Sequence, residues 1–281
     1  MSTQAQRPPR RRRARVWWLV LLVLIVVGGI AYGVHRSRQH TAPPPPPTPI
    51  NVTFPEGLRR EQIAAILAAK THLSASAYLA ETGVGGEGKV LAGTTTPRSL
   101  EGFLFPATYP ILPSTTVPQF VAAQLTAYRN YTAGVNYAYA ERKNLTPYDV
   151  LTIASMIERE VSVPAERPIV AGVIYNRLHA HMMLGIDATV QYALGYWKDN
   201  LTEADLQIDS PYNTRKYAGL PPGPISNPGL ASIQAAAHPA HVPYLYYVAR
   251  NDGSGSHYFA TSLAQFNQDV AKSQANLAKA G

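Results

Sequence analysis

Two glutamates near the end of one amphipathic segment are the side chains most able to do acid–base chemistry. Glu158 and Glu160 lie in the segment 147–161, whose apolar residues recur at helical spacing. At about 100° per residue, the two carboxylates fall on opposite edges of the apolar stripe, and Arg159 points outward. A carboxyl group at the edge of a buried face can have its pKa raised by desolvation, as a general acid near neutral pH requires. The spacing leaves both glutamates as candidates, and it also fits solvated charges that pair with Arg159 or Arg142.

The loop 210–229 is the second segment whose side chains could contact a substrate. It contains eight glycine or proline residues, which argue against a helix or a strand. Tyr212, Asn213 and Thr214 offer hydrogen-bond donors and acceptors next to an aromatic face, a combination that suits a sugar. Long ordered loops in compact domains are often functional. The same composition is also typical of a plain connection.

Other chemistries lack the residues that they need. The chain contains no cysteine, which excludes disulfides, thiolate metal sites and cysteine nucleophiles. The histidine pairs 179/181 and 238/241 do not have the helical HExxH spacing, and no third ligand stands at a diagnostic distance from them. No G-x-S-x-G, Walker or dinucleotide-binding sequence occurs. We therefore expect a site without a metal ion or a cofactor.

The positive charge of the chain is confined to its N-terminus. The sequence has 25 Lys and Arg residues against 17 Asp and Glu residues, a formal net charge of +8. Eight arginines lie at or before residue 38, while the first acidic residue is Glu56. Residues 39–281 therefore carry equal numbers of basic and acidic side chains. A cationic nucleic-acid-binding body is excluded in its simple form, and we expect no nucleic-acid partner.

Residues 16–34 are predicted to form a single transmembrane helix. They contain no charged residue, and about 20 apolar residues span the hydrocarbon core of a bilayer. The basic tail 1–15 precedes them, so the positive-inside rule places the N-terminus in the cytoplasm and the rest of the chain outside. A cleaved signal peptide, ending near the small-x-small sequence at 31–33, is the alternative. The proline-rich segment 35–49 is expected to form a stalk in polyproline II conformation.

The body beyond the stalk is expected to have an α+β fold in two parts. Residues 50–96 begin with a predicted strand at 50–54 and continue with helices at 59–70 and 74–82, an order that resembles a lysin-motif-type β-α-α module. Their last part, from residue 83, is predicted to be a loop or a connection. Residues 97–281 are predicted to form a mostly helical catalytic domain with a small β-hairpin region, made by 244–249 and 258–260.

Capping signals predict where the helices of the main domain begin. Thr146, with a proline and an aspartate in the following turn, is predicted to start the helix that carries the two glutamates. Thr116 is predicted to cap a helix that reaches residue 128, and Ser262 to cap a polar C-terminal helix. Pro164 is predicted to open a helix that reaches residue 178.

Several short sequences, taken in their order along the chain, resemble the motifs of one family. They are LEGFLFPATY at 100–109, ASMIERE at 154–160, VAGVIYNRL at 170–178, DATV at 187–190, YNT at 212–214, GLPPGPI at 219–225 and NPG at 227–229. Together they resemble the signature of the YceG-like endolytic murein transglycosylases. The match of the small module at 50–92 is weaker.

The resemblance implies a reaction and a catalytic residue. It implies that Glu158 is the catalytic acid, although Glu160 also matches a family position. The implied reaction cleaves the β-1,4 bond between N-acetylmuramic acid and N-acetylglucosamine within glycan strands and leaves a 1,6-anhydro end. Glu158 would protonate the leaving oxygen and then take a proton from the muramyl C6 hydroxyl, which attacks the anomeric carbon. Because the substrate supplies the nucleophile, one carboxylate suffices, whereas ordinary glycosidases need two.

Further residues are expected, from the same resemblance, to hold the sugar or to orient Glu158. These substrate-binding candidates are Asn176, Asp187, Tyr212, Asn213, Thr214 and His257. Arg177 is expected instead to be a structural ion-pair partner of Asp187.

The expected partner is the glycan strand of peptidoglycan, with peptidoglycan synthases and division proteins as further candidates. Peptidoglycan lies outside the cytoplasmic (inner) membrane, which agrees with a single-pass anchor and a catalytic domain on the outer or periplasmic side. Two alternatives stay open. One is a non-catalytic, membrane-tethered cell-wall-binding or division scaffold, and the other is a hydrolase that uses water in place of the C6 hydroxyl.

Overall fold

The computed structural model describes residues 11–37, 46–84, 99–198 and 200–280. The chain divides into two compact units, residues 1–48 and 49–281, and each is described by itself. The strands of the second unit are β1 (Ile50–Thr53), β2 (Thr108–Ile111), β3 (Tyr246–Ala249) and β4 (His257–Ala260). The helices are α1 (Arg11–Ser37), α2 (Arg60–Lys70), α3 (Ala75–Glu81), α4 (Val117–Thr132), α5 (Ala138–Glu141), α6 (Pro147–Glu160), α7 (Arg167–His179), α8 (Asp187–Leu194), α9 (Glu203–Leu206), α10 (Leu230–Ala237) and α11 (Leu263–Ala280), with a 3-10 turn η2 (Pro164–Glu166) before α7.

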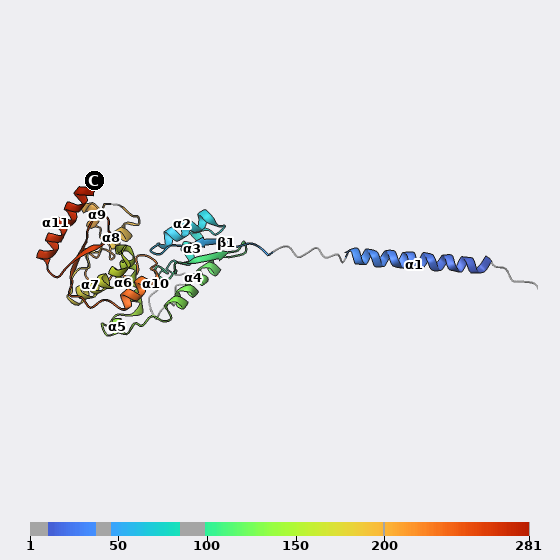
Figure 1. Cartoon of the computed structure of the whole chain (residues 1–281), viewed down its shortest axis with the longest axis horizontal. Helices are drawn as coiled ribbons and strands as arrows, with labels where there is room; N and C mark the ends of the chain where they lie inside the picture. The colour runs from blue at the N-terminus through green and yellow to red at the C-terminus, as the bar shows by residue number, and fades with distance from the viewer. Residues whose placement is uncertain (1–10, 38–45, 85–98, 199, 281) are drawn as a thin grey trace, which may run out of the picture. The chain divides into compact units, whose positions relative to one another are not determined.

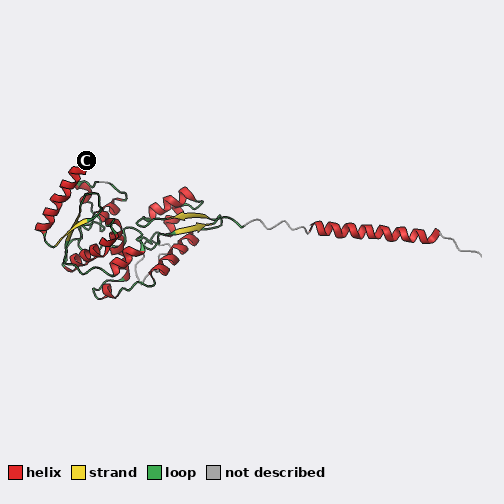
Figure 2. Ribbon diagram, viewed as in Figure 1, coloured by secondary structure: helices red, strands yellow, loops and turns green. Residues whose placement is uncertain are grey.

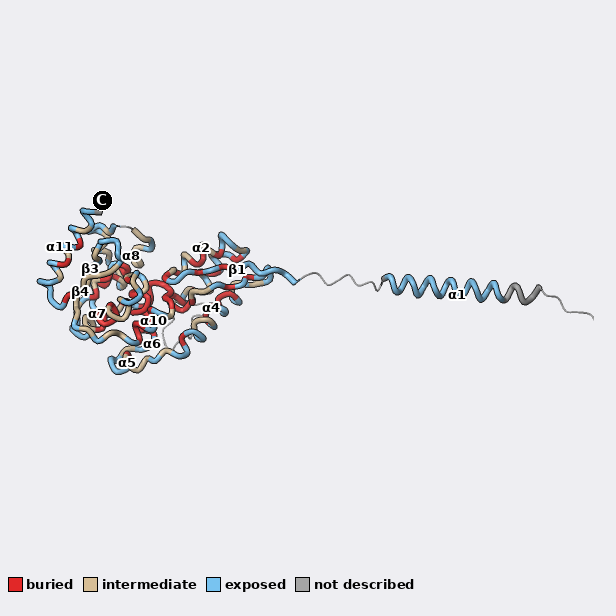
Figure 3. The backbone as a smooth tube through the Cα atoms, viewed as in Figure 1, coloured by how far each residue is buried: buried red, intermediate tan, exposed pale blue. Residues whose placement is uncertain are grey.

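The first unit contains the predicted apolar helix. In α1, the segment Trp17–Arg36 is long and apolar enough to cross a membrane, and a signal sequence would meet the same criteria. The side chains from Trp17 to Arg36 are all exposed (Figure 3). The helix extends beyond the predicted span 16–34 at both ends. Residues 1–10 of the predicted tail and residues 38–45 of the predicted stalk lie outside the described residues.

A small β-α-α-β arrangement begins the second unit. Strand β1 pairs antiparallel with β2, so that Ile50 faces Ile111 and Thr53 faces Thr108 (Figure 2). The predicted strand and the two predicted helices of this region are confirmed. The partner strand lies beyond residue 96, however, so the sheet joins the two predicted parts of the body. Residues 85–98, most of the predicted connection, lie outside the described residues.

Aromatic packing closes the space between this sheet and α4. The ring of Phe120, on α4, lies 5.5 Å from Phe54 and 5.5 Å from Tyr109 between ring centroids. The ring of Tyr78, on α3, lies 5.8 Å from the same Phe120. The predicted cap of α4 is confirmed, because the Thr116 hydroxyl accepts a hydrogen bond from the third helical residue.

Helix α6 is the central helix of the second unit. It begins at the predicted cap, where the Thr146 hydroxyl and the Asp149 carboxylate exchange hydrogen bonds with each other's backbone N–H groups. It packs mainly on α10 and also contacts α7 and α8. The predicted apolar stripe is buried, and residues on the other sides of the helix are buried as well. Buried residues accordingly gather around α6 and α10 (Figure 3).

Two later elements agree with the prediction and one differs. Strands β3 and β4 form the predicted hairpin, with Tyr247 facing Phe259 (Figure 2). Ser262 caps α11 as predicted, since its hydroxyl accepts from the N–H group of Gln265. The helix predicted to open at Pro164 is instead the 3-10 turn η2, and α7 begins only at Arg167.

The loop 210–229 has no helix or strand, as predicted, but most of its second half is buried. Asn227 holds it in place. Its Oδ1 accepts hydrogen bonds from the N–H groups of Gly102 and Leu104, and its Nδ2 donates to Glu101. Its backbone exchanges further hydrogen bonds with residues 57 and 58, so the small sheet region and the main helices share one framework.

Candidate active site

Glu160, the last residue of α6, has the surroundings of a proton donor. The hydroxyl group of Tyr247, on β3, donates a hydrogen bond to its Oε2 at 3.1 Å. Burial raises the pKa of Glu160 above its ordinary value, and the nearby Asp187 carboxylate raises it further. The Tyr247 hydrogen bond and the ring of His257 act in the opposite direction and lower this pKa. A carboxyl group that stays protonated at higher pH than usual is suited to general acid catalysis.

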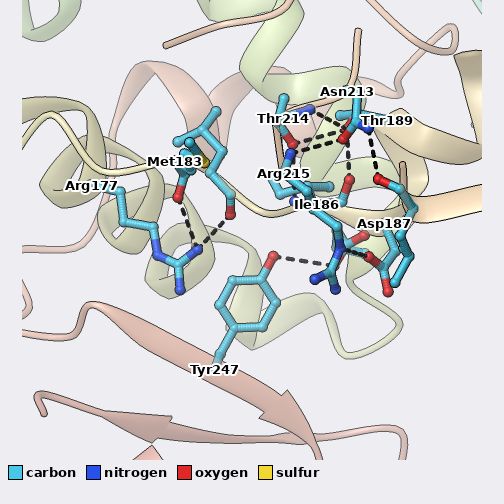
Figure 4. Close-up of polar contacts among 12 residues, drawn as sticks. Arg177, Met183, Ile186, Asp187, Thr189, Asn213, Thr214, Arg215 and Tyr247 are labelled. Atoms are coloured by element: carbon cyan, nitrogen blue, oxygen red, sulfur yellow. Dashed lines mark hydrogen bonds and ion pairs between the residues drawn. The ribbon is translucent and has the colours of Figure 1, made fainter. Parts of the chain in front are cut away.

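Asp187 and Arg215 form an ion pair beside Glu160. The guanidinium Nε donates to the carboxylate Oδ1 at 2.5 Å, and both side chains remain about half exposed, 50% for Asp187 and 41% for Arg215. Figure 4 shows this pair on one side of Tyr247 and Arg177 on the other. The pair therefore lies where a bound substrate could reach both charged groups.

Glu160, Tyr247, Asp187 and Arg215 form one cluster, called the Glu160 cluster below. His257, on strand β4, is its next member. Its Nδ1 lies 2.7 Å from Oε2 of Glu166, and its backbone N–H group donates to Oε1 of the same carboxylate at 3.0 Å. The edge of its ring meets Tyr247, with 5.4 Å between ring centroids. The two contacts from Glu166 fix the imidazole next to the tyrosine that contacts Glu160.

Arg177 supports this cluster through backbone carbonyls, and it has no ion pair with a carboxylate in the part of the chain that the structure describes. Its Nε donates to the Leu245 carbonyl and its Nη1 to the carbonyls of Met183 and Leu184 (Figure 4). The expectation that Arg177 pairs with Asp187 is wrong, because Asp187 pairs with Arg215 instead. Arg177 ties the end of α7 to the segment that enters β3.

Glu158 lies in a different environment from Glu160. Its Oε2 accepts hydrogen bonds from the Gly229 N–H group at 3.1 Å and from the Ser232 hydroxyl at 2.7 Å. Gly229 is the N-cap residue of α10, so Glu158 binds the first turn of that helix. A second carboxylate, that of Glu56, lies directly against the Gly229 backbone. Among the described residues, no ion pair joins Glu158 or Glu160 to Arg159 or Arg142.

The other predicted site residues divide into two groups. Asp187 and His257 lie in the Glu160 cluster. Asn176 uses its side-chain amide to donate to the carbonyls of Val242 and Tyr244, and it therefore supports the chain before β3.

The three predicted loop residues also make internal contacts. Asn213 donates from Nδ2 to the carbonyls of residues 206 and 208. The Thr214 hydroxyl lies 2.9 Å from that of Thr189 and accepts from the N–H group of Ile186, at the start of α8. The ring of Tyr212 packs against Tyr192, with 4.7 Å between centroids. These contacts hold the loop against α8, next to Asp187.

Three residues of the cluster were missed by the sequence analysis: Tyr247, Arg215 and Glu166. Tyr247 lies in the predicted hairpin, where the alternation of residues shows only that it faces one side of the sheet. Arg215 directly follows the candidate sequence YNT, which was a usable signal. Within the described residues, no group of three or more His, Cys, Asp or Glu side chains is arranged to hold a metal ion.

The fold and the site together define a class of protein: a mixed helical and β chain whose central helix ends in a carboxyl group suited to acid–base chemistry. The model of the YceG-like family matches residues 36–272. The chain belongs to the YceG-like family.

Curated relatives and a solved structure extend this comparison. The chain is 40% identical over 235 residues to the endolytic murein transglycosylase of Bacillus subtilis, covering 79% of this chain and 64% of that protein. It is 34% identical over 255 residues to the protein of the same name from Streptococcus pneumoniae, covering 83% and 46%. The chain thus spans less than two thirds of the length of these relatives. A crystal structure of a YceG-like protein from Listeria monocytogenes superposes with a TM-score of 0.68 at 34% identity, covering 79% of this chain and 76% of that chain.

Proposed function

We propose that this chain is an endolytic peptidoglycan lytic transglycosylase. It cleaves the β-1,4 bond between N-acetylmuramic acid and N-acetylglucosamine within glycan strands and leaves 1,6-anhydro-muramyl ends. The names of its relatives support the substrate and the reaction. The observation that carries the chemistry is the half-buried carboxyl group of Glu160, which accepts a hydrogen bond from Tyr247, lies close to Asp187 and has a raised pKa.

In the proposed reaction, Glu160 acts first as an acid and then as a base. Its carboxyl proton goes to the oxygen of the leaving N-acetylglucosamine as the glycosidic bond breaks. The carboxylate then accepts the proton of the muramyl C6 hydroxyl, whose oxygen bonds to the anomeric carbon. The proton count balances, no water is consumed, and the carboxyl group is regenerated.

Contacts favour Glu160 over Glu158, the residue expected from the sequence resemblance. Both hydrogen bonds to Glu158 come from the first turn of α10, so this carboxylate holds a helix end. Glu160 instead contacts the cluster that contains Asp187 and His257, two of the predicted substrate-binding residues. Glu158, the catalytic residue that the resemblance implies, remains the second candidate for the same role, and the variants described below decide between the two glutamates.

Substrate contacts are proposed for the exposed polar groups around Glu160. Asp187 and Arg215 together offer acceptors and donors to sugar hydroxyl and acetamido groups. Asn176, Tyr212, Asn213 and Thr214 act mainly through the loop and strand segments that they hold, with Tyr212 half-buried at the surface of that loop.

The cellular arrangement is part of the proposal. The apolar helix α1 and the basic residues before it support a single-pass anchor in the cytoplasmic membrane, with the N-terminus inside and residues 50–281 on the outer side. The order β1-α2-α3 supports a lysin-motif-like module at the start of the body, followed by the catalytic domain. Peptidoglycan synthases and division proteins are the proposed protein partners.

Product analysis tests the proposed reaction. The full chain, in detergent micelles, is incubated with purified glycan strands, and the products are measured by mass spectrometry. We expect internal cleavage and anhydro-muramyl ends, both lost in Glu160→Gln by at least about a hundredfold. Glu158→Gln is the matched comparison, and we expect it to retain measurable cleavage.

The same assay separates the alternatives. Bound but intact strands would contradict the enzyme and favour a cell-wall-binding scaffold. Reducing muramyl ends, heavier by one water, would show a hydrolase. Complete loss in Glu158→Gln together with an active Glu160→Gln would return the catalytic role to Glu158.

A further inference from the structure

A hollow of about 400 Å³ is lined by residues of α10, of the beginning of α7 and of the chain that leads into α5. Helix α10 contacts both α7 and α5, and the three helices are labelled in Figure 1. The walls of the hollow are mainly small or apolar, and three of its side chains can form hydrogen bonds. The lining residues are Gly134, Val135, Pro164, Arg167, Pro168, Ala231, Gln234, Ala235 and His238. The Glu160 cluster contributes none of them, so this hollow is separate from the proposed reaction site.

Arg167 brings an unsatisfied donor into this hollow. Its Nε is buried and has no hydrogen-bond partner among the described residues. No ion pair joins its guanidinium group to a carboxylate among the described residues. A buried donor without an acceptor costs roughly 1–3 kcal/mol, so the described residues leave this guanidinium group incompletely satisfied. The planar guanidinium group presents paired N–H donors that match the two oxygens of a carboxylate.

Two polar side chains of α10 accompany Arg167. Gln234 and His238 are four residues apart and therefore lie on the same face of the helix. Both are exposed, and neither side chain has a hydrogen bond to another described residue. The hollow thus combines a cation, an amide and an imidazole, with no carboxylate in its lining.

The surrounding charge favours a ligand with one negative charge. Burial and the nearby Glu158 carboxylate raise the pKa of Glu56, and Arg167 is close enough to lower it in part. A dianion such as phosphate would meet repulsion from these two glutamates with only one arginine to offset it. A single carboxylate carries half of that charge and fits the guanidinium group in a bidentate manner.

The hollow is connected to the reaction site through neighbouring residues. Glu166, immediately before Arg167, holds His257 of the Glu160 cluster with two hydrogen bonds. Glu166 therefore contacts the Glu160 cluster, and Arg167 lines the hollow. Their Cα atoms are about 3.8 Å apart because the two residues are adjacent in the chain. A strand whose sugar lies at Glu160 could place an attached side group at the hollow.

We propose that Arg167, Gln234 and His238 form a subsite for a carboxylate of the peptide that is attached to the muramyl residue of a glycan strand. The proposal rests on the proposed function for the identity of the substrate. It makes the peptide a determinant of substrate binding, in addition to the sugars.

Binding of a soluble probe tests the subsite without any cleavage. The probe is an N-acetylmuramyl tripeptide with free carboxyl groups, compared with the same molecule after amidation of every peptide carboxyl group. Calorimetry on the full chain in micelles should show binding of the acid form and about tenfold or weaker binding of the amide. Arg167→Gln should weaken binding of the acid form by about tenfold or more and leave the amide unchanged.

Two further variants guard this test against misfolding and general charge effects. Gln234→Ala alters an exposed side chain and should weaken the acid form by about two- to fivefold. Arg129→Gln, which removes an exposed charge on α4 that is not among the residues lining the hollow, should leave binding unchanged. Equal affinity for both forms of the probe, or equal weakening by Arg129→Gln, would overturn the subsite, as would displacement of the probe by inorganic phosphate at similar concentration.

Turnover separates this inference from the proposed function. With strands that carry peptides, Arg167→Gln should raise KM and leave kcat nearly unchanged; with strands stripped of peptides, it should change neither. Equal effects on both kinds of strand would overturn the subsite alone. Failure of the wild-type chain to cleave either kind of strand would contradict the proposed reaction, while the probe measurement would still decide the subsite.

Discussion

The hydroxyl group of Tyr247 donates a hydrogen bond to Oε2 of Glu160 across 87 residues of sequence. This contact joins the C-terminal hairpin to the end of the central helix. It also lowers a pKa that burial raises, so the two effects set the pH range in which Glu160 can donate a proton.

We expect Tyr247→Phe to shift the pH dependence of cleavage upward. The loss of the hydroxyl removes an interaction that lowers the pKa of Glu160, so the carboxyl group stays protonated to higher pH. Since the first step requires the protonated form, the alkaline limb of the kcat/KM profile should move up by roughly half to one pH unit. The rate itself should fall several-fold because Glu160 is less well oriented. An unchanged profile would contradict the role of Tyr247.

Asp187→Asn should shift the same limb in the opposite direction. The carboxylate of Asp187 raises the pKa of Glu160, and the amide would not. The variant should therefore lose activity at lower pH than the wild type, by a fraction of a unit because Asp187 is half exposed and paired with Arg215. KM should rise as well if Asp187 contacts the sugar. Glu203→Gln, an exposed charge on α9, is the matched control and should leave the profile unchanged.

Burial of Glu101 predicts a pH dependence of folding stability. Burial raises the pKa of its carboxyl group to about 8, whereas an unfolded chain has the ordinary value near 4.5. Between these values the folded chain binds the extra proton, so the free energy of unfolding should fall as pH rises, by at most about 1.4 kcal/mol per pH unit. Urea unfolding followed by near-ultraviolet circular dichroism measures this slope. The neutral variant Glu101→Gln should show a smaller slope, and an equal slope in both proteins would rule out Glu101 as its source.

Gly172→Ala should destabilise the chain although alanine favours helices. A Cβ atom at this position of α7 would lie 2.5 Å from the carbonyl oxygen of Ala240 and 2.8 Å from Val242. The backbone carbonyl cannot rotate away, so the chain before β3 must shift, at a cost of about 1–3 kcal/mol. That cost exceeds the helical gain of up to about 1 kcal/mol. Gly134→Ala, where an added Cβ has no described atom within 4 Å, is the control and should change the unfolding midpoint little.

Local signals predicted much of the secondary structure. The Thr146 and Thr116 caps bind the backbone N–H groups that their positions imply, because capping depends only on residues within one turn. Helix α7 begins three residues later than the proline signal predicts, because a proline in the first turn is compatible with both a 3-10 turn and a helix. The pairing of β1 with β2 was not predicted, because strand partners more than 50 residues apart leave no periodic signal.

The sequence by itself determined an apolar N-terminal helix, a neutral body, the family motifs and two glutamates on opposite edges of one buried helix. Helical periodicity places Glu158 and Glu160 almost symmetrically, so it could not rank them. Only the tertiary structure decided their surroundings: α10 supplies donors to Glu158, and the hairpin supplies Tyr247 to Glu160. The pKa of a carboxyl group depends on the burial, charges and donors around it, and those come here from segments distant in the chain.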